Sequence, residues 1–342
     1  MATQKIKRTL TQVEGEFRIW TICLMILAAV AVAGTLSYTR PVMIPFVLAI
    51  FASYIAQPVV ELLVLKLRLP KSVALALTLL TGVILMSLIF LLLSSAVSSL
   101  ISSADLYRVR ILNLANDLVS TAESHGFPVD RSQILQGIRD LPFFDFLGKA
   151  AGHIASFAST FILVVVFVFF ILSGRKTTAP RKGLEQEIHL KITRYLVIRT
   201  LTSTLTGILV GGILSLLGVD LALLFGVLTF LLNFIPTLGS IIATLLPIPI
   251  ALLQMESLID VFWVIAIPGT LQFLIGTILE PRLLGQSLDL HPVTLVLSLI
   301  FWGLIWGTAG AFLAVPITAI LKIVLERFPK TRVVGALLAG RL

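Results

Sequence analysis

Long apolar stretches alternate with short polar segments along the whole chain. A helix needs roughly 20 apolar residues to cross the hydrocarbon core of a bilayer. Eight stretches approach or exceed that length, at residues 20–36, 42–65, 73–101, 154–172, 201–217, 221–253, 261–279 and 293–321. The pattern predicts an all-α polytopic membrane protein with about eight transmembrane helices, two of them interrupted.

The sixth stretch is interrupted by a polar segment, Asn233-Phe-Ile-Pro-Thr-Leu-Gly-Ser240. Pro236 removes an amide donor, and Gly239 loosens the turn. The side chains of Asn233, Thr237 and Ser240 are able to satisfy backbone groups that such a break frees. Backbone that leaves the helix inside a membrane must be buried in protein or line a wet cavity, so this segment is a candidate transport site. A loop joining two helices at the membrane surface is the alternative.

The last stretch contains a second set of helix-breaking residues, Gly303, Gly307, Gly310 and Pro316. Two interrupted helices in one half of a chain favour a transporter. If each interrupted stretch is a single crossing, the chain crosses eight times and both termini lie on one side. A hairpin that enters and leaves the same side is the alternative, and it would re-thread the last segments.

The polar segments predict how the chain is oriented. Residues 1–19, 66–71, 174–199 and 322–342 hold nineteen of the 26 Lys and Arg residues. Because Lys and Arg mark cytoplasmic loops, these segments and both termini are expected in the cytoplasm. Residues 102–150 carry six acidic and five basic residues, a broken helical period and an apolar end, which predicts a small helical insertion outside the cytoplasm.

The expected organisation follows from these segments. It comprises a cytoplasmic N-terminus at 1–19, three transmembrane helices at 20–101, the extracytoplasmic insertion at 102–150, a fourth helix at 151–173, a basic cytoplasmic segment at 174–200, a transport core with two interrupted helices at 201–321 and a basic cytoplasmic tail at 322–342.

Composition agrees with a membrane protein and excludes a soluble globule. Hydrophobic residues make up 58% of the chain, charged residues 13%, and the mean hydropathy is +1.06. Soluble domains carry roughly 25% charged residues. The net charge of +9 comes from residues flanking apolar stretches, so it indicates contact with lipid headgroups rather than nucleic acid. The lone cysteine, Cys23, excludes an intramolecular disulfide.

Small and weakly polar residues form one face of the fifth stretch: Thr200, Ser203, Thr204, Gly207 and Gly211. The Gly207-x-x-x-Gly211 spacing allows close backbone approach. Helix packing is the simpler interpretation of this face, and lining of a substrate path is the other.

Charged residues close the seventh stretch at Glu280-Pro281-Arg282. A carboxylate within the hydrocarbon is costly unless it is paired or protonated, and such residues mark pathways or proton relays. Pro281 is expected to break the helix between Glu280 and Arg282. An interfacial Glu280, with Arg282 reaching the headgroups, is the alternative.

Enzyme motifs are missing from the chain. It contains no His-Glu-x-x-His, no Gly-x-Ser-x-Gly and no Gly-x-x-x-x-Gly-Lys-Ser/Thr sequence, and its four His residues are scattered. We therefore expect no enzymatic activity, no cofactor and no metal site, and any active transport must use an ion gradient.

The C-terminal half resembles the autoinducer-2 exporter family of bacterial membrane proteins. The resemblance rests on 233–240, on Leu279-Glu-Pro-Arg-Leu-Leu-Gly285, on Leu297-Ser-Leu-Ile-Phe-Trp-Gly303 and on 310–326. The N-terminal half matches in layout and in Pro45 and Gln57-Pro58, where many relatives have Asn-Pro.

The resemblance implies an inner-membrane protein of about eight spans that forms a homo-oligomer, with a pentamer as the suggested form. It also implies export of a small hydrophilic molecule, the quorum-sensing signal autoinducer-2. Other members resemble sodium or lithium/proton antiporters, which keeps antiport with Glu280 as titrating group as an alternative. A membrane scaffold acting through 102–150 is the alternative from another class. By position, the family's motif residues here are Asn233, Pro236, Gly239, Glu280, Pro281 and Arg282.

Overall fold

The computed structural model describes residues 20–21, 23–102, 104–124, 143–174, 183–255, 257–285 and 288–341. Within these ranges every regular element is helical, which confirms the predicted all-α membrane fold. The elements are α2 (Arg40–Leu65), α3 (Lys71–Ser102), α4 (Ala104–Ser124), α6 (Phe143–Gly174), α7 (Leu184–Leu216), α8 (Ala222–Leu232), α9 (Leu238–Leu245), α10 (Ile248–Gln254), α11 (Leu258–Phe273), η1 (Leu274–Leu279), α12 (Glu280–Leu284), α13 (Pro292–Arg327) and α14 (Arg332–Leu338).

Among the described residues, five helices are long and apolar enough to cross a membrane, by length and composition. They are Arg40–Leu65, Lys71–Ser102, Leu184–Leu216, Leu258–Leu284 and Pro292–Arg327, of which the last reaches this length only when the two helices on either side of a kink at Gly307 are counted together. Shorter apolar helices occupy Cys23–Tyr38, Ser159–Gly174, Ala222–Leu232 and Leu238–Gln254. The helix of the fourth apolar stretch begins at Phe143, so the apolar end expected in the insertion is part of α6. Residues 125–142 of the insertion lie outside the described ranges, as do 1–19 and 175–182.

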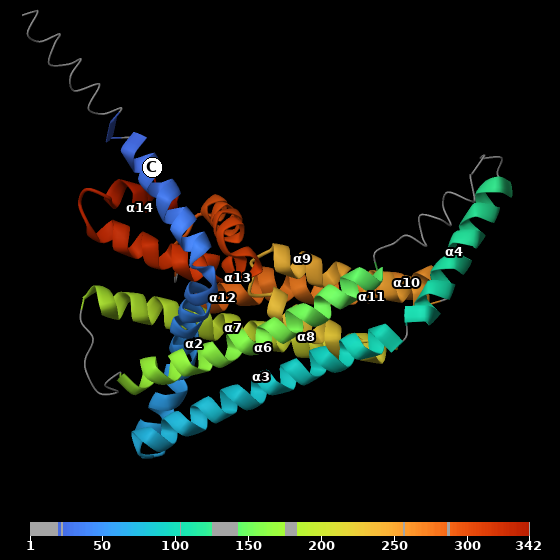
Figure 1. Ribbon diagram of the computed structural model, residues 1–342, viewed down its shortest axis with the longest axis horizontal. Helices are drawn as coiled ribbons and strands as arrows, with labels where there is room; N and C mark the ends of the chain where they lie inside the picture. The colour runs from blue at the N-terminus through green and yellow to red at the C-terminus, as the bar shows by residue number, and fades with distance from the viewer. Residues whose placement is uncertain are drawn as a thin grey trace, which may run out of the picture.

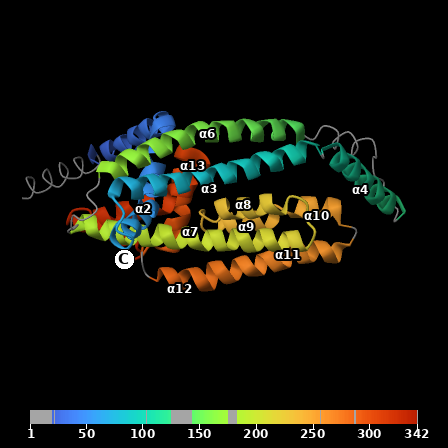
Figure 2. The same cartoon turned by 90° about the horizontal axis from the view of Figure 1, so that it is seen from below.

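The long helices α3, α6, α7 and α11 run side by side, and α2 crosses them steeply near one end (Figures 1 and 2). Ala49 and Val60 of α2 pack there with Leu75 of α3 and Leu172 of α6. We call this the basic end, because the α2–α3 connection, with Lys66, Arg68 and Lys71, lies there together with α12, which carries Arg282 (Figures 1 and 2). The opposite, far end carries the α7–α8 and α10–α11 connections, and α4 projects beyond it (Figure 1).

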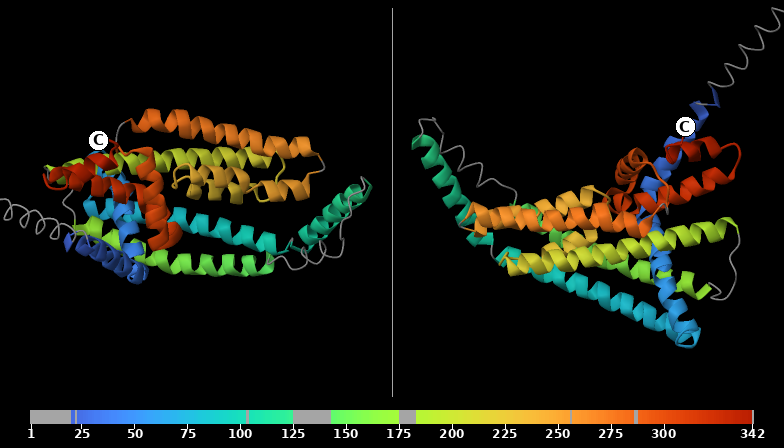
Figure 3. Two further views of the ribbon diagram at one scale, coloured as in Figure 1. Left: turned by 90° about the horizontal axis from the view of Figure 1, so that it is seen from above. Right: turned by 180° about the vertical axis from the view of Figure 1, so that it is seen from behind.

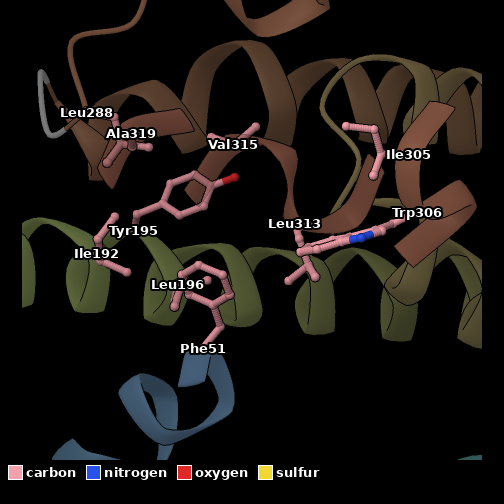
Figure 4. Close-up of a cluster of buried hydrophobic side chains, with 10 residues drawn as sticks. All are labelled: Phe51, Ile192, Tyr195, Leu196, Leu288, Ile305, Trp306, Leu313, Val315 and Ala319. Carbon is pink, nitrogen blue, oxygen red and sulfur yellow. The ribbon is translucent and has the colours of Figure 1, made fainter. Parts of the chain in front are cut away.

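A second buried cluster joins α2, α7 and α13 near the basic end (Figure 4). Phe51 of α2 contacts Leu196 of α7, while Tyr195 on the same helix points toward Val315 and Ala319 of α13. Trp306 extends this cluster and donates its Nε1–H to the backbone oxygen of Leu36 at 3.0 Å. The N-terminal helices are thereby attached to the C-terminal part of the chain.

The stretch 221–253 forms a hairpin, which we call hairpin 1 (α8 to α10). Its two arms, α8 and α9, lie side by side (Figure 2). At the far end, Gln254 donates to the oxygen of Gly218 at 2.6 Å and accepts from the amide of Asp220 at 2.8 Å. The two ends of the stretch therefore meet at the same end of the bundle.

The stretch 292–327 also folds back on itself, as hairpin 2. Gly307 leaves the helical conformation with φ 64° and ψ −142°, and divides α13 into two arms. Trp302 Nε1 donates to Thr318 Oγ1 of the other arm at 3.2 Å. At the basic end, the buried Lys322 ammonium lies 2.9 Å from Asp289, just before the first arm. Hairpin 2 thus begins and ends at the basic end.

These hairpins correct the expectation that each interrupted stretch crosses once. The alternative that a hairpin enters and leaves one side, which the apolar pattern left open, is the arrangement found for both. The reason is the polar bridge at each mouth: Gln254 with Gly218 and Asp220, and Lys322 with Asp289. The break predicted at 233–240 is the tip of hairpin 1, and Gly307, one of the four residues expected to interrupt the last stretch, is the tip of hairpin 2.

The C-terminal half therefore contains the same unit twice, in opposite directions. α7 runs toward the far end and is followed by hairpin 1, whereas α11, η1 and α12 run back to the basic end and are followed by hairpin 2 (Figures 2 and 3). Inverted repeats of this kind are a recurrent architecture of secondary transporters.

Candidate transport site

The tip of hairpin 1 contacts the second arm of hairpin 2. Phe234, at the tip of hairpin 1, stacks on Phe312 of hairpin 2, with ring centroids 4.5 Å apart and an interplanar angle of 26°. Phe234 also makes an edge contact with Phe230 of α8 at 5.5 Å. Two interrupted segments that enter from opposite ends are thus joined by an aromatic contact.

The tip of hairpin 1 is a tight and strained turn. The amide of Leu238 donates to the oxygen of Pro236 at 2.7 Å. Thr237 between them has φ 60° and ψ −57°, which is the rare γ-turn conformation. A non-glycine residue there costs of order 1–3 kcal/mol, and strain of this kind gathers at functional sites. Thr237 Oγ1 donates to the Pro236 oxygen at 2.7 Å, and Ser240 Oγ donates to the Thr237 oxygen at 2.9 Å.

A glycine after each tip allows the two arms to touch. A Cβ on Gly239 would lie 1.8 Å from the carbonyl oxygen of Leu232 on the opposite arm. A Cβ on Gly310 would lie 1.8 Å from the oxygen of Trp302 on the first arm of hairpin 2. Because no side chain fits at either position, both hairpins require glycine there.

The small residues of α7 split between two faces. Ser203, Gly207 and Gly211 are buried, and Gly207 and Gly211 pack against α8, where a Cβ on Gly226 would lie 2.8 Å from the Gly207 oxygen. Thr200 is half-buried and Thr204 is exposed, and each donates to its own helix at 2.8 Å. The glycines therefore serve close packing of hairpin 1.

Glu280 pairs with Arg199 of α7, and the two side chains expose 14% and 8% of their surface. Next to this pair, Arg194 donates to the oxygen of Leu283 at 3.1 Å. Arg282, two residues after Glu280, is exposed. The site residue that the sequence analysis missed is thus Arg199, which it placed in the basic segment 174–200.

A π-helical segment, η1, precedes Glu280, and the helix continues without a break past Pro281. The expectation that Pro281 breaks the helix is wrong, because the chain stays helical to Leu284 and ends at Gly285 with φ 57°. Proline lacks an amide and crowds the carbonyl one turn earlier. The wider π turn gives that ring room, and π segments of this kind often lie at functional sites.

The remaining candidates are distributed along both hairpins. Asn233 and Pro236 are half-buried at the tip of hairpin 1. In hairpin 2, Gly303 is half-buried, and a Cβ added to it would meet nothing within 4 Å, whereas Gly310 and Pro316 are buried. The structure thus brings the 233–240 segment near hairpin 2 and joins Glu280 to α7, but it does not pair Glu280 with Arg282.

Comparison with known proteins agrees with this architecture. Residues 20–330 match the family described as AI-2E family transporter. The AI-2 transport protein TqsA of Escherichia coli strain K12 is 29% identical over 331 residues, covering 93% of this chain and 95% of that protein. A putative transport protein of Haemophilus influenzae is 30% identical over 334 residues, covering 92% and 94%. The putative permease PerM of Escherichia coli strain K12 is 27% identical over 180 residues, covering 49% and 51%.

The family match extends over nearly the whole chain and includes both hairpins and the Arg199–Glu280 pair. The comparisons confirm the resemblance seen in the sequence motifs, and a family of transporters is not an enzyme family, as expected. The chain belongs to the AI-2E transporter family.

Proposed function

We propose that the protein is a secondary transporter that exports a small hydrophilic molecule, autoinducer-2, across the bacterial inner membrane. The observation that carries the proposal is the pair of opposed hairpins, which are joined where Phe234 at the tip of hairpin 1 stacks on Phe312 of hairpin 2. Non-helical backbone at membrane depth is tolerated where it is buried in protein or lines a cavity, and broken helices meeting there form transporter sites. The relative named as an AI-2 transport protein supports the choice of substrate.

The orientation of the chain follows from its charges. Lys71, Arg282 and Lys322 lie at the basic end, so the proposal places this end in the cytoplasm, together with both termini. Hairpin 1 then enters from outside and hairpin 2 from inside. We also propose a homo-oligomer, because α4 projects from the bundle with Leu106 and Val109 exposed (Figure 1).

Sodium/proton antiport is the competing transport activity. It requires a carboxylate that is free to exchange a proton and a cation, and the Glu280 carboxylate is engaged by the Arg199 guanidinium. A buried carboxylate held by a fixed positive charge is a poor cation ligand. Export of a hydrophilic molecule therefore accounts for the site better than antiport.

The test is flux into proteoliposomes that contain the purified full-length protein. Autoinducer-2 and sodium are supplied separately, each with and without a proton gradient. We expect autoinducer-2 movement above that of protein-free liposomes, and its loss when Asn233→Ala and Pro236→Ala are combined at the tip of hairpin 1. The control combines Ser95→Ala and Thr81→Val, two exposed positions on α3.

Three outcomes contradict the proposal. Sodium-dependent proton flux without autoinducer-2 movement would establish antiport instead. Full autoinducer-2 flux in the variant with Asn233→Ala and Pro236→Ala would show that the tip of hairpin 1 is not part of the transport site. Absence of any flux from folded protein, with a phenotype that depends on residues 102–150, would favour the scaffold.

A further inference from the structure

Four buried polar atoms in the core have no hydrogen-bond partner among the described residues. They are Arg199 Nε, Ser203 Oγ, Thr229 Oγ1 and Gln272 Oε1. Their residues are almost closed to solvent, with exposed fractions of 7%, 1%, 0% and 6% in that order. Buried polar groups in proteins are nearly always paired, so each exception requires an explanation.

The register of the helices places the four residues that carry these atoms at similar positions along the bundle. Ser203 follows Arg199 by one turn on the buried face of α7. α8 runs antiparallel to α7, with Gly226 against Gly207, and this register puts Thr229 beside the same turns of α7.

The register of the third helix agrees with this placement. Arg199 pairs with Glu280, and Val210 packs with Val264 in one cluster, so Gln272 falls between these two contacts. The three helices therefore place the four residues within about two helical turns, or roughly 11 Å along the axis.

Neighbouring hydroxyl groups show that this is not a general property of the region. Thr202 donates to the oxygen of Ile198 at 3.0 Å, and Thr206 donates to the oxygen of Thr202 at 2.7 Å. Gln272 uses its nitrogen to donate to Thr244 at 2.8 Å, which leaves its oxygen unpaired. Ser203 and Thr229 lack the backbone bond that the other two hydroxyls make, although their helices offer it.

The chemistry of these atoms defines what could bind them. The guanidinium Nε–H donates, the amide oxygen accepts, and the two hydroxyl groups do both. The charges of Arg199 and Glu280 cancel, so a bound ion of either sign would add an unbalanced charge to a site of low dielectric constant. An uncharged molecule with several hydroxyl or carbonyl groups satisfies all four atoms and adds no charge.

We propose that Arg199, Ser203, Thr229 and Gln272 form a binding site for an uncharged, polyhydroxylated small molecule between α7, hairpin 1 and α11. The site rests on the proposed transport function, since it supplies the binding step of export. It also names residues that would bind the exported molecule, which the contact between the two hairpins does not. The packing of α8 on α7 covers the site, so hairpin 1 must move for the ligand to enter or leave.

Equilibrium binding to the full-length protein in lipid nanodiscs tests the site. The probes are autoinducer-2, ribose, ribose 5-phosphate and sodium, which separate uncharged polyols from an anionic sugar and from a cation. We expect an uncharged polyol to bind, and ribose 5-phosphate to bind at least tenfold more weakly than ribose. Ser203→Ala and Thr229→Val should each weaken polyol binding by about tenfold, as expected for one lost hydrogen bond.

Stability separates a binding role from a structural one. Thr229→Val keeps the shape of the side chain and removes an unpaired polar atom, so its unfolding temperature should stay equal or rise while binding weakens. The matched control is Thr81→Val, at an exposed position of α3 whose hydroxyl bonds its own helix. Ser95→Ala is the corresponding control for Ser203→Ala.

Polyol affinity unchanged in both Ser203→Ala and Thr229→Val would overturn the proposal, as would tighter binding of sodium or of ribose 5-phosphate than of either polyol. Failure of folded protein to bind either polyol would also overturn it. If autoinducer-2 flux persists while these variants bind normally, the site is wrong and the transport function stands. If the site binds polyols and flux is absent, the binding site stands and the proposed transport function is wrong.

Discussion

Arg199 and Glu280 form a buried ion pair between the two repeated units of the C-terminal half. A pair of this kind is costly to desolvate, and its main energetic consequence appears when one partner is removed, because the other charge is then left buried alone. The pair also orients the guanidinium, so that Nη1 is taken by Glu280 and Nε is left for another acceptor.

Replacing one partner of this pair should therefore lower stability more than replacing both. Glu280→Gln leaves the Arg199 charge unpaired and should lower the free energy of unfolding by about 3–5 kcal/mol. Combining it with Arg199→Met removes both charges and should recover most of that loss. Denaturant unfolding of the detergent-solubilised variants as a double-mutant cycle measures this. A double variant less stable than Glu280→Gln alone would contradict a simple ion pair.

The spacing of residues in the sequence indicates that Arg199 lies on the buried face of its helix, although its charge suggests a position outside the membrane. Ile192, Tyr195, Leu196, Ser203 and Thr206 fall on one helical face with Arg199, at spacings of three and four residues. A hydropathy scale predicts that an arginine lies outside the membrane, because the scale assigns each residue its own free energy of transfer from water and takes no account of a partner. Its partner is 81 residues away, so local pattern could not show that the charge is compensated.

Each hairpin is closed by contacts at both ends, which makes it a rigid element. Hairpin 1 has Gly239 against Leu232 near its tip and Gln254 against Gly218 at its mouth. Hairpin 2 repeats this with Gly310 against Trp302 and Lys322 against Asp289. Further helices reach both mouths: Arg110 of α4 donates to the oxygen of Leu253 at 3.2 Å, and the Leu338 oxygen at the end of α14 accepts from the amide of His291 at 3.1 Å.

Alanine at the tip glycines should disrupt the hairpins. Gly239→Ala and Gly310→Ala place a methyl group on a carbonyl oxygen, so backbone must move, and the loss should exceed the 1–3 kcal/mol typical of an overpacked side chain. Gly303→Ala on the same arm as Trp302 is the control, since it meets nothing and should be neutral or stabilising. Thermal unfolding compares the three, and equal stability of all would mean that the arms do not touch there.

Hydropathy predicted that these elements exist but not how they are threaded. An apolar stretch of about 33 residues has the same composition whether it crosses the membrane or turns back within it. Pro236, Gly239 and Gly307 identified the turns, because their backbone properties are local. The direction after each turn depends on Gln254 and Lys322, polar residues whose partners are far away in sequence or lie in a loop.

At the scale of the whole molecule, the orientation in the membrane is open to direct measurement. In a Cys23→Ala background, Leu258→Cys places a thiol at the far end and Arg68→Cys places one at the basic end. A membrane-impermeant maleimide added to intact spheroplasts should label Leu258→Cys, and should label Arg68→Cys only after lysis. The reverse pattern would invert the proposed direction of both hairpins.

The π segment Leu274–Leu279 gives the whole molecule a property that its static packing does not reveal. A π turn contains one residue more than an α turn, so rewinding it to α geometry would rotate everything after it by about 100°. Glu280 follows it directly, and such a rotation would carry the carboxylate away from Arg199 without sliding α11 along its axis. The link between the two inverted halves is thus governed by the winding of six residues, and a torsional change rather than a translation is enough to uncouple them.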